Sequence, residues 1–330
     1  MSEAAKPSVS IVLEMENGRL IGDAEVVGVV ATLCNEIQAD AHAGSRPEVI
    51  FMMPGSPGEL SILQEKLSLS LPELASLADV RFRSIEDGRY YSLKNEGARL
   101  ARNDIVIFAD SDTELEPGWL HALRDAFVDP EVMATNGFTY LLHSDFMSRV
   151  YALFWMFPLR KGDERFAAKR ALNANNCAFR RSFFLENSFP DHPGFKVSCS
   201  LLLHQLNRKQ VQLKRVTAYA GHKSPEGTRF FLWRALVTGR DNDRRYAAMR
   251  SGSRIARVSH AFRRFFTSLW RSSVRIVTKH RFVQLPFWQV PAALVVVAVF
   301  HLISFAGQFS LAAGLVRERV EHVPGYVIRS

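Results

Sequence analysis

The chain has 330 residues, which is enough for one large domain or two ordinary ones. Hydrophobic residues make up 47% and charged residues 23% of it, proportions that exclude a disordered tail protein, a collagen-like fibre and a polytopic channel. Its three cysteines are widely spaced and form no C-x-x-C pair, so we expect a reducing compartment rather than a disulfide scaffold or a zinc module. The formal net charge is +9, and the excess lies after residue 222. No positively charged end precedes an apolar run at the N-terminus, so we expect no secretory signal peptide.

Short apolar runs alternate with longer helical patterns over the first 140 residues. Strands are predicted at 9–13, 48–53, 80–85 and 104–109, and helices at 23–43, 60–69 and 93–101. This order predicts an α/β domain with a doubly wound, mostly parallel sheet flanked by helices. Ligands of such domains bind at the carboxyl ends of the strands.

The alternation breaks down after about residue 140. We expect an amphipathic helix at 145–155, an extended piece at 173–179, a helix at 198–207 and a strand at 211–216. The stretch 229–275 is rich in arginine interleaved with Phe, Trp and Leu. This pattern is typical of amphipathic helices at an anionic membrane surface, and also of some nucleic-acid surfaces.

The sequence Asp110-Ser111-Asp112 follows the predicted strand 104–109 directly. Two carboxylates at a strand end can face one cavity and hold a divalent cation whose remaining ligands are substrate phosphates. The alternative is an acidic turn, or a cap for the next helix, which begins near Pro117.

Further motifs surround this pair in a fixed order. Residues 91–98 contain Asn95 and Gly97, residues 173–181 read Asn-Ala-Asn-Asn-Cys-Ala-Phe-Arg-Arg, and residues 216–222 follow the predicted strand 211–216 and end in His222. Together with the Asp-Ser-Asp motif, this set resembles the family 2 glycosyltransferases of GT-A fold over residues 9 to 225.

The resemblance implies transfer of a sugar from a nucleotide-sugar to an acceptor hydroxyl, with inversion and with a divalent cation, Mn or Mg. It implies roles for the matching residues, which fall into three groups. These are metal binding by Asp110, Asp112 and His222, donor binding by Glu14, Asn95, Asp110 and Asp112, and acceptor binding by Asn175, Asn176 and Arg180.

Two motifs of the family are altered. An Asp-Asp-Gly-Ser type sequence that helps bind the nucleobase is replaced by Met52-Met53-Pro54-Gly55-Ser56, which leaves this role to Glu14 or Glu16. The acidic pair that supplies the general base is replaced by Ser198-Cys199, and neither residue is a competent base at neutral pH. Asp191 is the expected catalytic substitute and His192 the second choice, although a loop carboxylate that only caps a turn is an equal alternative.

An uncharged run of 32 residues, 285–316, follows the arginine-rich stretch. It exceeds the roughly 20 residues that cross a bilayer, so we expect a transmembrane helix rather than a buried core helix. Residues 223–281 contain 15 Lys or Arg and three acids, which by the positive-inside rule places the catalytic domain on the cytoplasmic face of the cell (plasma or inner) membrane.

The expected organisation is therefore a glycosyltransferase domain at 1–225, with a donor half to about 140 and an acceptor half at 141–225. A basic amphipathic membrane-interface region at 226–284, the transmembrane helix at 285–316 and a tail at 317–330 follow. The predicted function is a membrane-anchored glycosyltransferase that uses a nucleotide-sugar donor and a lipid-linked or polysaccharide acceptor, with anionic lipids as partners and no nucleic acid. The alternatives are a catalytically impaired lipid-binding or scaffold protein and, with less support, a processive polymer synthase.

Overall fold

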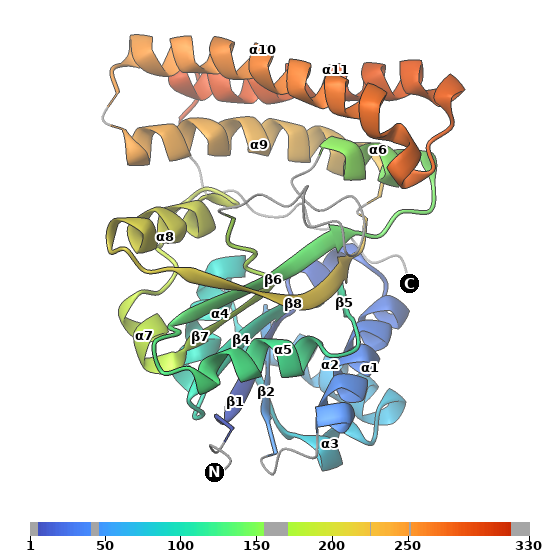
Figure 1. The fold of residues 1–330 in the computed structure, drawn as a ribbon, viewed down its shortest axis with the longest axis vertical. Helices are drawn as coiled ribbons and strands as arrows, with labels where there is room; N and C mark the ends of the chain where they lie inside the picture. The colour runs from blue at the N-terminus through green and yellow to red at the C-terminus, as the bar shows by residue number, and fades with distance from the viewer. Residues whose placement is uncertain (1–5, 41–45, 155–170, 225, 251, 318–330) are drawn as a thin grey trace.

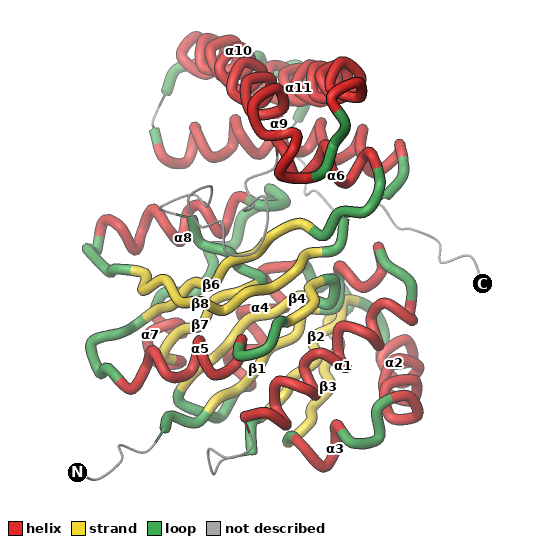
Figure 2. The backbone as a smooth tube through the Cα atoms, turned by 45° about the vertical axis from the view of Figure 1, so that its right-hand side comes forward, coloured by secondary structure: helices red, strands yellow, loops and turns green. Residues whose placement is uncertain are grey.

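The computed structural model describes residues 6–40, 46–154, 171–224, 226–250 and 252–317. A sheet of eight strands lies at its centre, in the order β3-β2-β1-β4-β7-β6-β8-β5 (Figures 1 and 2). The strands are β1 (Val9–Glu14), β2 (Glu48–Pro54), β3 (Asp79–Ile85), β4 (Ile105–Asp110), β5 (Thr113–Leu115), β6 (Ala134–Leu141), β7 (Asn176–Arg180) and β8 (Leu213–His222).

Helices cover both faces of the sheet. On one face pack α1 (Asp23–Asp40), α2 (Pro57–Ser70), α3 (Leu74–Leu77) and α5 (Trp119–Asp125), and on the other α4 (Tyr90–Leu100), α7 (Arg181–Glu186) and α8 (Val197–Arg208). Alternate residues of β1 serve the two cores, since Ile11 and Leu13 join the first and Val12 the second. Short 3-10 turns occupy η1 (Asn17–Leu20) and η3 (Ala126–Val128).

The first four strands are parallel, as the alternation of the sequence predicts. The second half is mixed, because β7 runs antiparallel to β4 and to β6, while β6 and β8 are parallel. The predicted α/β class and flanking helices are confirmed. The strands β5 and β6 were not predicted. The strand β5 has only three residues, too few for a pattern. In β6 a Cβ at position 137 would overlap the Ala218 carbonyl and the Asn176 side chain, so glycine is required there and interrupts the run of strand-forming residues.

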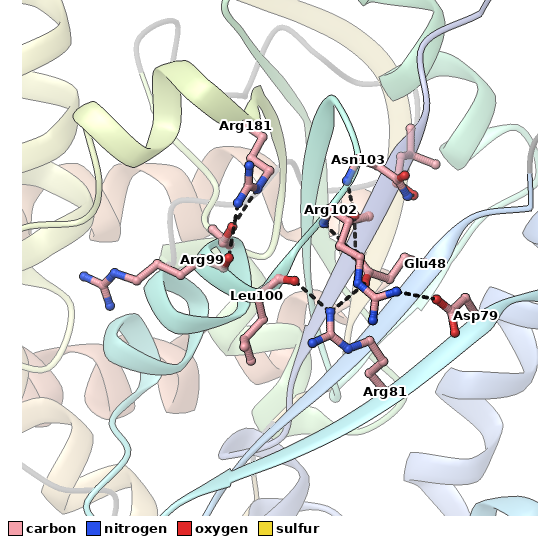
Figure 3. Close-up of polar contacts among 11 residues, drawn as sticks. Glu48, Asp79, Arg81, Arg99, Leu100, Arg102, Asn103 and Arg181 are labelled. Carbon is pink, nitrogen blue, oxygen red and sulfur yellow. Dashed lines mark hydrogen bonds and ion pairs between the residues drawn. The ribbon is translucent and has the colours of Figure 1, made fainter.

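The edge of the sheet where β2 and β3 begin is held by a polar network (Figure 3). Glu48 is buried and accepts hydrogen bonds from Arg81 at 2.8 Å and from Ser10 at 2.6 Å. Burial alone would raise the pKa of Glu48, but these hydrogen bonds, with that from the Arg102 amide, lower it below its ordinary value. Arg181 donates hydrogen bonds to the Ala98 and Arg99 carbonyls at the end of α4, each at 3.2 Å. This edge is therefore structural.

Four helices form a separate layer above the sheet: α6 (Phe146–Phe154), α9 (Thr228–Met249), α10 (Arg254–Lys279) and α11 (Val290–Ala312), with η5 (His280–Val283) and η6 (Phe287–Gln289) joining the last two. Figures 1 and 2 show α10 and α11 outermost, with α9 between them and the sheet. The helices α9 and α11 approach so closely that a Cβ at Gly239 would overlap the Ser304 carbonyl, and one at Gly307 the Leu236 carbonyl. Glycine at both positions allows this backbone contact.

The helices α9, α10 and α11 lie in the segments expected to form the membrane-interface region and the transmembrane helix. The helix α6 belongs to the expected acceptor half, yet it packs in the core of this layer through Val150 and Leu153. The expected tail lies outside the described residues apart from Arg317. All three cysteines are free, in agreement with the absence of a predicted disulfide.

Candidate active site

Carboxylates gather where β1 and β4 end. The parallel register pairs Glu14 with Asp110, because both are the last residues of neighbouring strands. Asp112 follows two residues later, and Glu16 lies just after β1. All four side chains are buried or nearly so, with exposures of 0% for Glu14 and 5% for Asp112. So dense an acidic cluster requires positive charge nearby.

Asp110 has its counter-charge within the protein. Its carboxylate accepts a hydrogen bond from Lys94 Nζ at 2.6 Å, and both groups are almost fully buried. The Tyr90 hydroxyl donates to it at 2.8 Å and Asn17 Nδ2 at 3.2 Å. The helix α4 positions Lys94 and Tyr90, which are one helical turn apart on its buried face. Asp110 is therefore the anchor of this polar core.

Asp112 meets a different partner. Its Oδ2 lies 3.3 Å from Nε2 of His222, because Thr113 of β5 pairs with His222 of β8. His222 Nδ1 lies 2.6 Å from the Lys223 carbonyl, which is an acceptor only, so this nitrogen carries a proton. Nε2 is then the nitrogen that faces the Asp112 carboxylate, with which it can share a proton or a cation.

Burial perturbs the acidity of this cluster. It raises the pKa of Asp112, the charge of Asp110 adds to the rise, and His222 opposes it. Burial, followed by the charge of Asp110, also raises the pKa of Glu14 well above its ordinary value. Burial lowers the pKa of Lys196, and the negative charge of Asp110 opposes this change. A divalent cation placed here would reverse the rise of the carboxyl pKa values.

The residues present fit a divalent cation with two protein ligands. The three predicted ligands, Asp110, Asp112 and His222, do not converge: among the described residues no group of three His, Cys, Asp or Glu side chains does so. Asp110 is excluded from such a group because Lys94 and Tyr90 occupy it. Asp112 and His222 remain, and cations of this kind are commonly completed by phosphate oxygens and water.

A pocket of about 220 Å³ lies beside the acidic cluster. Glu16, Tyr90, Asn95, Asp191 and Ser198 are among its lining residues. Glu16 rather than Glu14 reaches it: Glu14 is fully buried and accepts a hydrogen bond from the Asn17 amide at 3.3 Å. Asn95 lines the pocket but exchanges hydrogen bonds with the Phe189 backbone, at 2.8 and 3.1 Å, so it fixes that loop.

Asp191 lies at the rim of the pocket. Its side chain is 87% exposed and forms an ion pair with Arg89. His192 Nδ1 accepts a hydrogen bond from the Gly194 amide at 3.0 Å, which engages this nitrogen in the turn. Of the two, Asp191 has the more accessible group.

The expected acceptor residues occupy three different environments. Asn175 is largely buried, and its Oδ1 accepts a hydrogen bond from Thr139 at 3.1 Å. Asn176 is fully buried and bonds Trp119 Nε1 and two backbone carbonyls, which makes it a structural residue. Arg180 pairs with Ile105, at the start of β4, and donates to carbonyls of the 127–132 segment. It lies at the sheet edge opposite Asp110, so its assignment to the acceptor site was wrong.

Ser198 and Cys199, at the altered base positions, offer no carboxylate to the pocket. Ser198 is buried in the pocket wall. Cys199 donates to the Leu172 carbonyl at 3.0 Å, and burial raises the pKa of its thiol to about 11.

Four functional side chains were not predicted: Asn17, Tyr90, Lys94 and Lys196. A signal for Lys94 exists in the sequence, since it shares a helical face with Tyr90, Gly97 and Ala98, all of them apolar or small. A lysine on such a face indicates a buried partner. Lys196 offers no such signal, because it precedes its helix and meets the cluster only through the tertiary fold.

The sheet carries helices on both faces, and its acidic site lies at the carboxyl ends of the parallel strands β1 and β4, where α/β proteins of this kind bind their ligands. Residues 32–189 match the family model described as Glycosyl transferase family 2. The chain therefore carries a glycosyltransferase family 2 domain and is a glycosyltransferase, as its motifs predict.

Two solved structures are similar. The mannosyltransferase PcManGT from Pyrobaculum calidifontis in complex with GDP-Man and Mn2+ is 14% identical with a TM-score of 0.51, over 94% of this chain and 86% of that one. GalNAc-T7 with UDP, GalNAc and Mn2+ is 16% identical with a TM-score of 0.48, over 75% of this chain and 51% of that one. The first of these similarities supports the GT-A fold. No curated protein sequence matches the chain.

Proposed function

We propose that this glycosyltransferase transfers a sugar from a nucleotide-sugar to a lipid-linked acceptor at the cytoplasmic face of a membrane, with inversion at the anomeric carbon. The observation that carries the proposal is the contact between Asp112 and His222 at the carboxyl edge of the sheet, beside the 220 Å³ pocket. A polysaccharide acceptor fits the same chemistry, but the apolar outer surface of the helical layer favours a lipid.

Asp112 and His222 would hold a divalent cation, Mn or Mg, with the donor diphosphate. When bound, the cation would neutralise the charge that develops on the leaving nucleoside diphosphate. Lys94 fixes the Asp110 carboxylate through their 2.6 Å ion pair, and Asp110 in turn holds Asn17 and, at the pocket, Tyr90. Lys196 supplies a second positive charge, with its Nζ 3.2 Å from the centre of the Tyr90 ring.

A hydroxyl acceptor needs a general base. In the described pocket the carboxylates are Glu16 and Asp191, and we propose Asp191 for this role because it is exposed at the rim where an acceptor enters.

The second candidate function is a lipid-binding or scaffold protein that binds a donor without turnover. Ser198 and Cys199 in place of acids are the observation that favours it.

A donor screen tests the proposal. Purified full-length protein is melted with UDP-, GDP- and dTDP-sugars, with and without Mn2+, and nucleotide release is followed in parallel. We expect one nucleotide class to raise the melting temperature only when Mn2+ is present, and to release its nucleotide slowly by hydrolysis. Stabilisation without any release, even with membrane extract added as acceptor, would favour the scaffold. No metal-dependent stabilisation by any donor would contradict both.

The helical layer supplies the membrane contact. The helix α10 exposes Phe262, Phe266 and Trp270 at four-residue spacing, with Trp270 71% exposed, and α11 exposes Val295 and Leu302 on its own outer face. An exposed apolar face of this size on a soluble surface is unusual and marks a binding surface. The segment Phe287–Ala312 is long and apolar enough to cross a membrane. The helix α11 packs along the length of α9, and this favours an orientation of α11 parallel to the membrane plane. We therefore propose that α10 and α11 attach the protein in the plane of the membrane.

Removal of two aromatic side chains should weaken this attachment. The double variant Phe266→Ser, Trp270→Ser loses apolar area that the headgroup region would bury, and each such side chain contributes about 1.5–3 kcal/mol when fully buried. We therefore expect co-flotation with phosphatidylglycerol vesicles to fall by at least about tenfold. The control is Ile62→Ser, Leu69→Ser, which removes two equally exposed apolar residues from α2. Equal flotation of both variants and the parent would contradict membrane contact through α10.

A further inference from the structure

A second cavity, of about 440 Å³, lies between α9, α10 and α11. One acidic side chain, Asp241, lines it. Its lining also includes five basic side chains, which are Lys196, Arg234, Arg245, Arg264 and Arg271. The polar stripe of the otherwise apolar α11, which contains His301, Ser304 and Gln308, faces the same space. The donor site described above uses Lys196 but none of the four arginines.

The arginines of this cavity repel one another. Burial, together with the smaller effect of the charges of Arg245 and Arg271, lowers the pKa of Arg264 to about 10. Within the described residues Arg264 Nε has no hydrogen-bond partner, and neither Arg264 nor Arg271 forms an ion pair with an acid. Asp241 is already engaged, because it accepts hydrogen bonds from the Phe195 and Lys196 amides at 3.1 and 2.8 Å. Arg264 and Arg271 thus bring two guanidinium groups without an acidic partner to one cavity, which makes it an anion site, and the planar fork of a guanidinium group matches phosphate.

The cavity adjoins the active-site pocket. Phe195 lines the pocket, while the next residue, Lys196, lines the cavity. The charge of Lys196 also acts on Asp110 and Asp112, which places it between the arginines and the acidic cluster. A phosphate group held in this cavity would therefore lie close to the active-site pocket.

The two faces of α10 connect the cavity with the membrane. Arg264 and Arg271 are seven residues apart and share the cavity face, whereas Phe262, Phe266 and Trp270 occupy the exposed face. Arg271 is itself exposed and marks the mouth of the cavity. A ligand whose phosphate enters here would keep an attached hydrocarbon chain next to the apolar surface.

We propose that this cavity binds the phosphate group of a lipid phosphate monoester, and that an oxygen of this phosphate is the acceptor of the sugar. The inference rests on the proposed function and names its acceptor. It also accounts for Ser198 and Cys199, because such an acceptor needs no general base. The second pKa of a phosphate monoester is about 6, so its oxygens are already deprotonated at neutral pH.

The transfer is balanced without a proton. One oxygen of the phosphate dianion forms a bond to the anomeric carbon of the donor. The bond from that carbon to the diphosphate breaks, and its electron pair leaves with the nucleoside diphosphate. The acceptor becomes a singly charged phosphodiester, and the charge that it loses appears on the leaving group.

The test uses the full-length protein in detergent micelles, with farnesyl phosphate, farnesol, inorganic phosphate and phosphatidylglycerol as separate additives. We expect farnesyl phosphate alone to raise the melting temperature and to accelerate nucleotide release from the stabilising donor. Arg264→Gln should weaken farnesyl phosphate binding by about tenfold or more, since hydrogen bonds to charged groups are of that strength. Arg271→Gln, at the exposed mouth, should weaken it without disturbing the fold. Arg263→Gln, the neighbouring exposed arginine on the opposite face, should bind as the parent does.

The outcomes separate the acceptor from the donor chemistry. Equal stabilisation by phosphatidylglycerol would mean a general headgroup site, and equal acceleration by farnesol would mean a hydroxyl acceptor; either overturns the proposal. So does unchanged binding in both Arg264→Gln and Arg271→Gln. Metal-dependent donor binding would survive each of these failures, whereas failure of the proposed function would remove it.

Discussion

Replacing Asp112 by Asn is expected to reduce sugar transfer by about 10²–10³-fold while the fold is retained, since this is the usual loss when one electrostatic contact to a developing charge is removed. The carboxylate is buried and faces His222 Nε2 at 3.3 Å. The amide keeps the size of the side chain but removes the charge that a hard cation requires. Nucleotide release in the presence of Mn2+ measures the effect.

A matched control lies at the other end of the same strand. Asp104 precedes β4, is exposed and accepts a hydrogen bond from Ser8 at 2.8 Å. Asp104→Asn makes the same chemical change far from the site and should leave transfer unchanged. We expect Asp112→Asn to melt as the parent does without ligand, and to lose the stabilisation by donor and Mn2+. Full metal-dependent stabilisation of this variant would show that Asp112 is not a ligand.

The fold of the first half was predictable because its strands are apolar on both faces. The runs at β1, β2 and β4 stand out from the amphipathic helices between them. Once the strands are parallel, the positions of Glu14 and Asp110 at one edge follow from topology alone. The direction of β7 does not follow from any local pattern. Its antiparallel pairing with β4 carries Arg180 to the far edge, which is why the acceptor assignment failed.

The arginine-rich segment shows a second limit of pattern analysis. Its composition indicates a membrane surface, and an amphipathic helix is confirmed at α10. Amphipathic helices normally direct their apolar face to the core and their charges to solvent. In this layer Phe266 and Trp270 face outward, while Arg264 faces the cavity. The sequence specifies two faces of the helix, and only the packing of α11 determines which one is covered.

Replacing Lys94 by Met is expected to destabilise the protein by about 3–5 kcal/mol, because it leaves a buried carboxylate without its counter-charge. Lys94 is fully buried, donates to Asp110 at 2.6 Å and also to the Ala109 carbonyl at 3.1 Å. Denaturant unfolding of the two proteins measures the difference. The surface variant Lys66→Met removes a lysine from an exposed pair with Asp23 and should cost less than about 1 kcal/mol.

The double variant Lys94→Met, Asp110→Asn identifies the cause of that loss. Neutralising Asp110 removes the uncompensated charge while its hydrogen bond from Tyr90 can persist, so the double variant should be more stable than Lys94→Met alone. Its donor affinity should remain low, because Asn17 and Tyr90 are positioned through the Asp110 carboxylate. If the two losses of stability simply add, the pair contributes no coupling energy. Lys94 would then act through its contact with the Ala109 carbonyl, and the acidic cluster would have to be balanced by the bound cation and Lys196 alone.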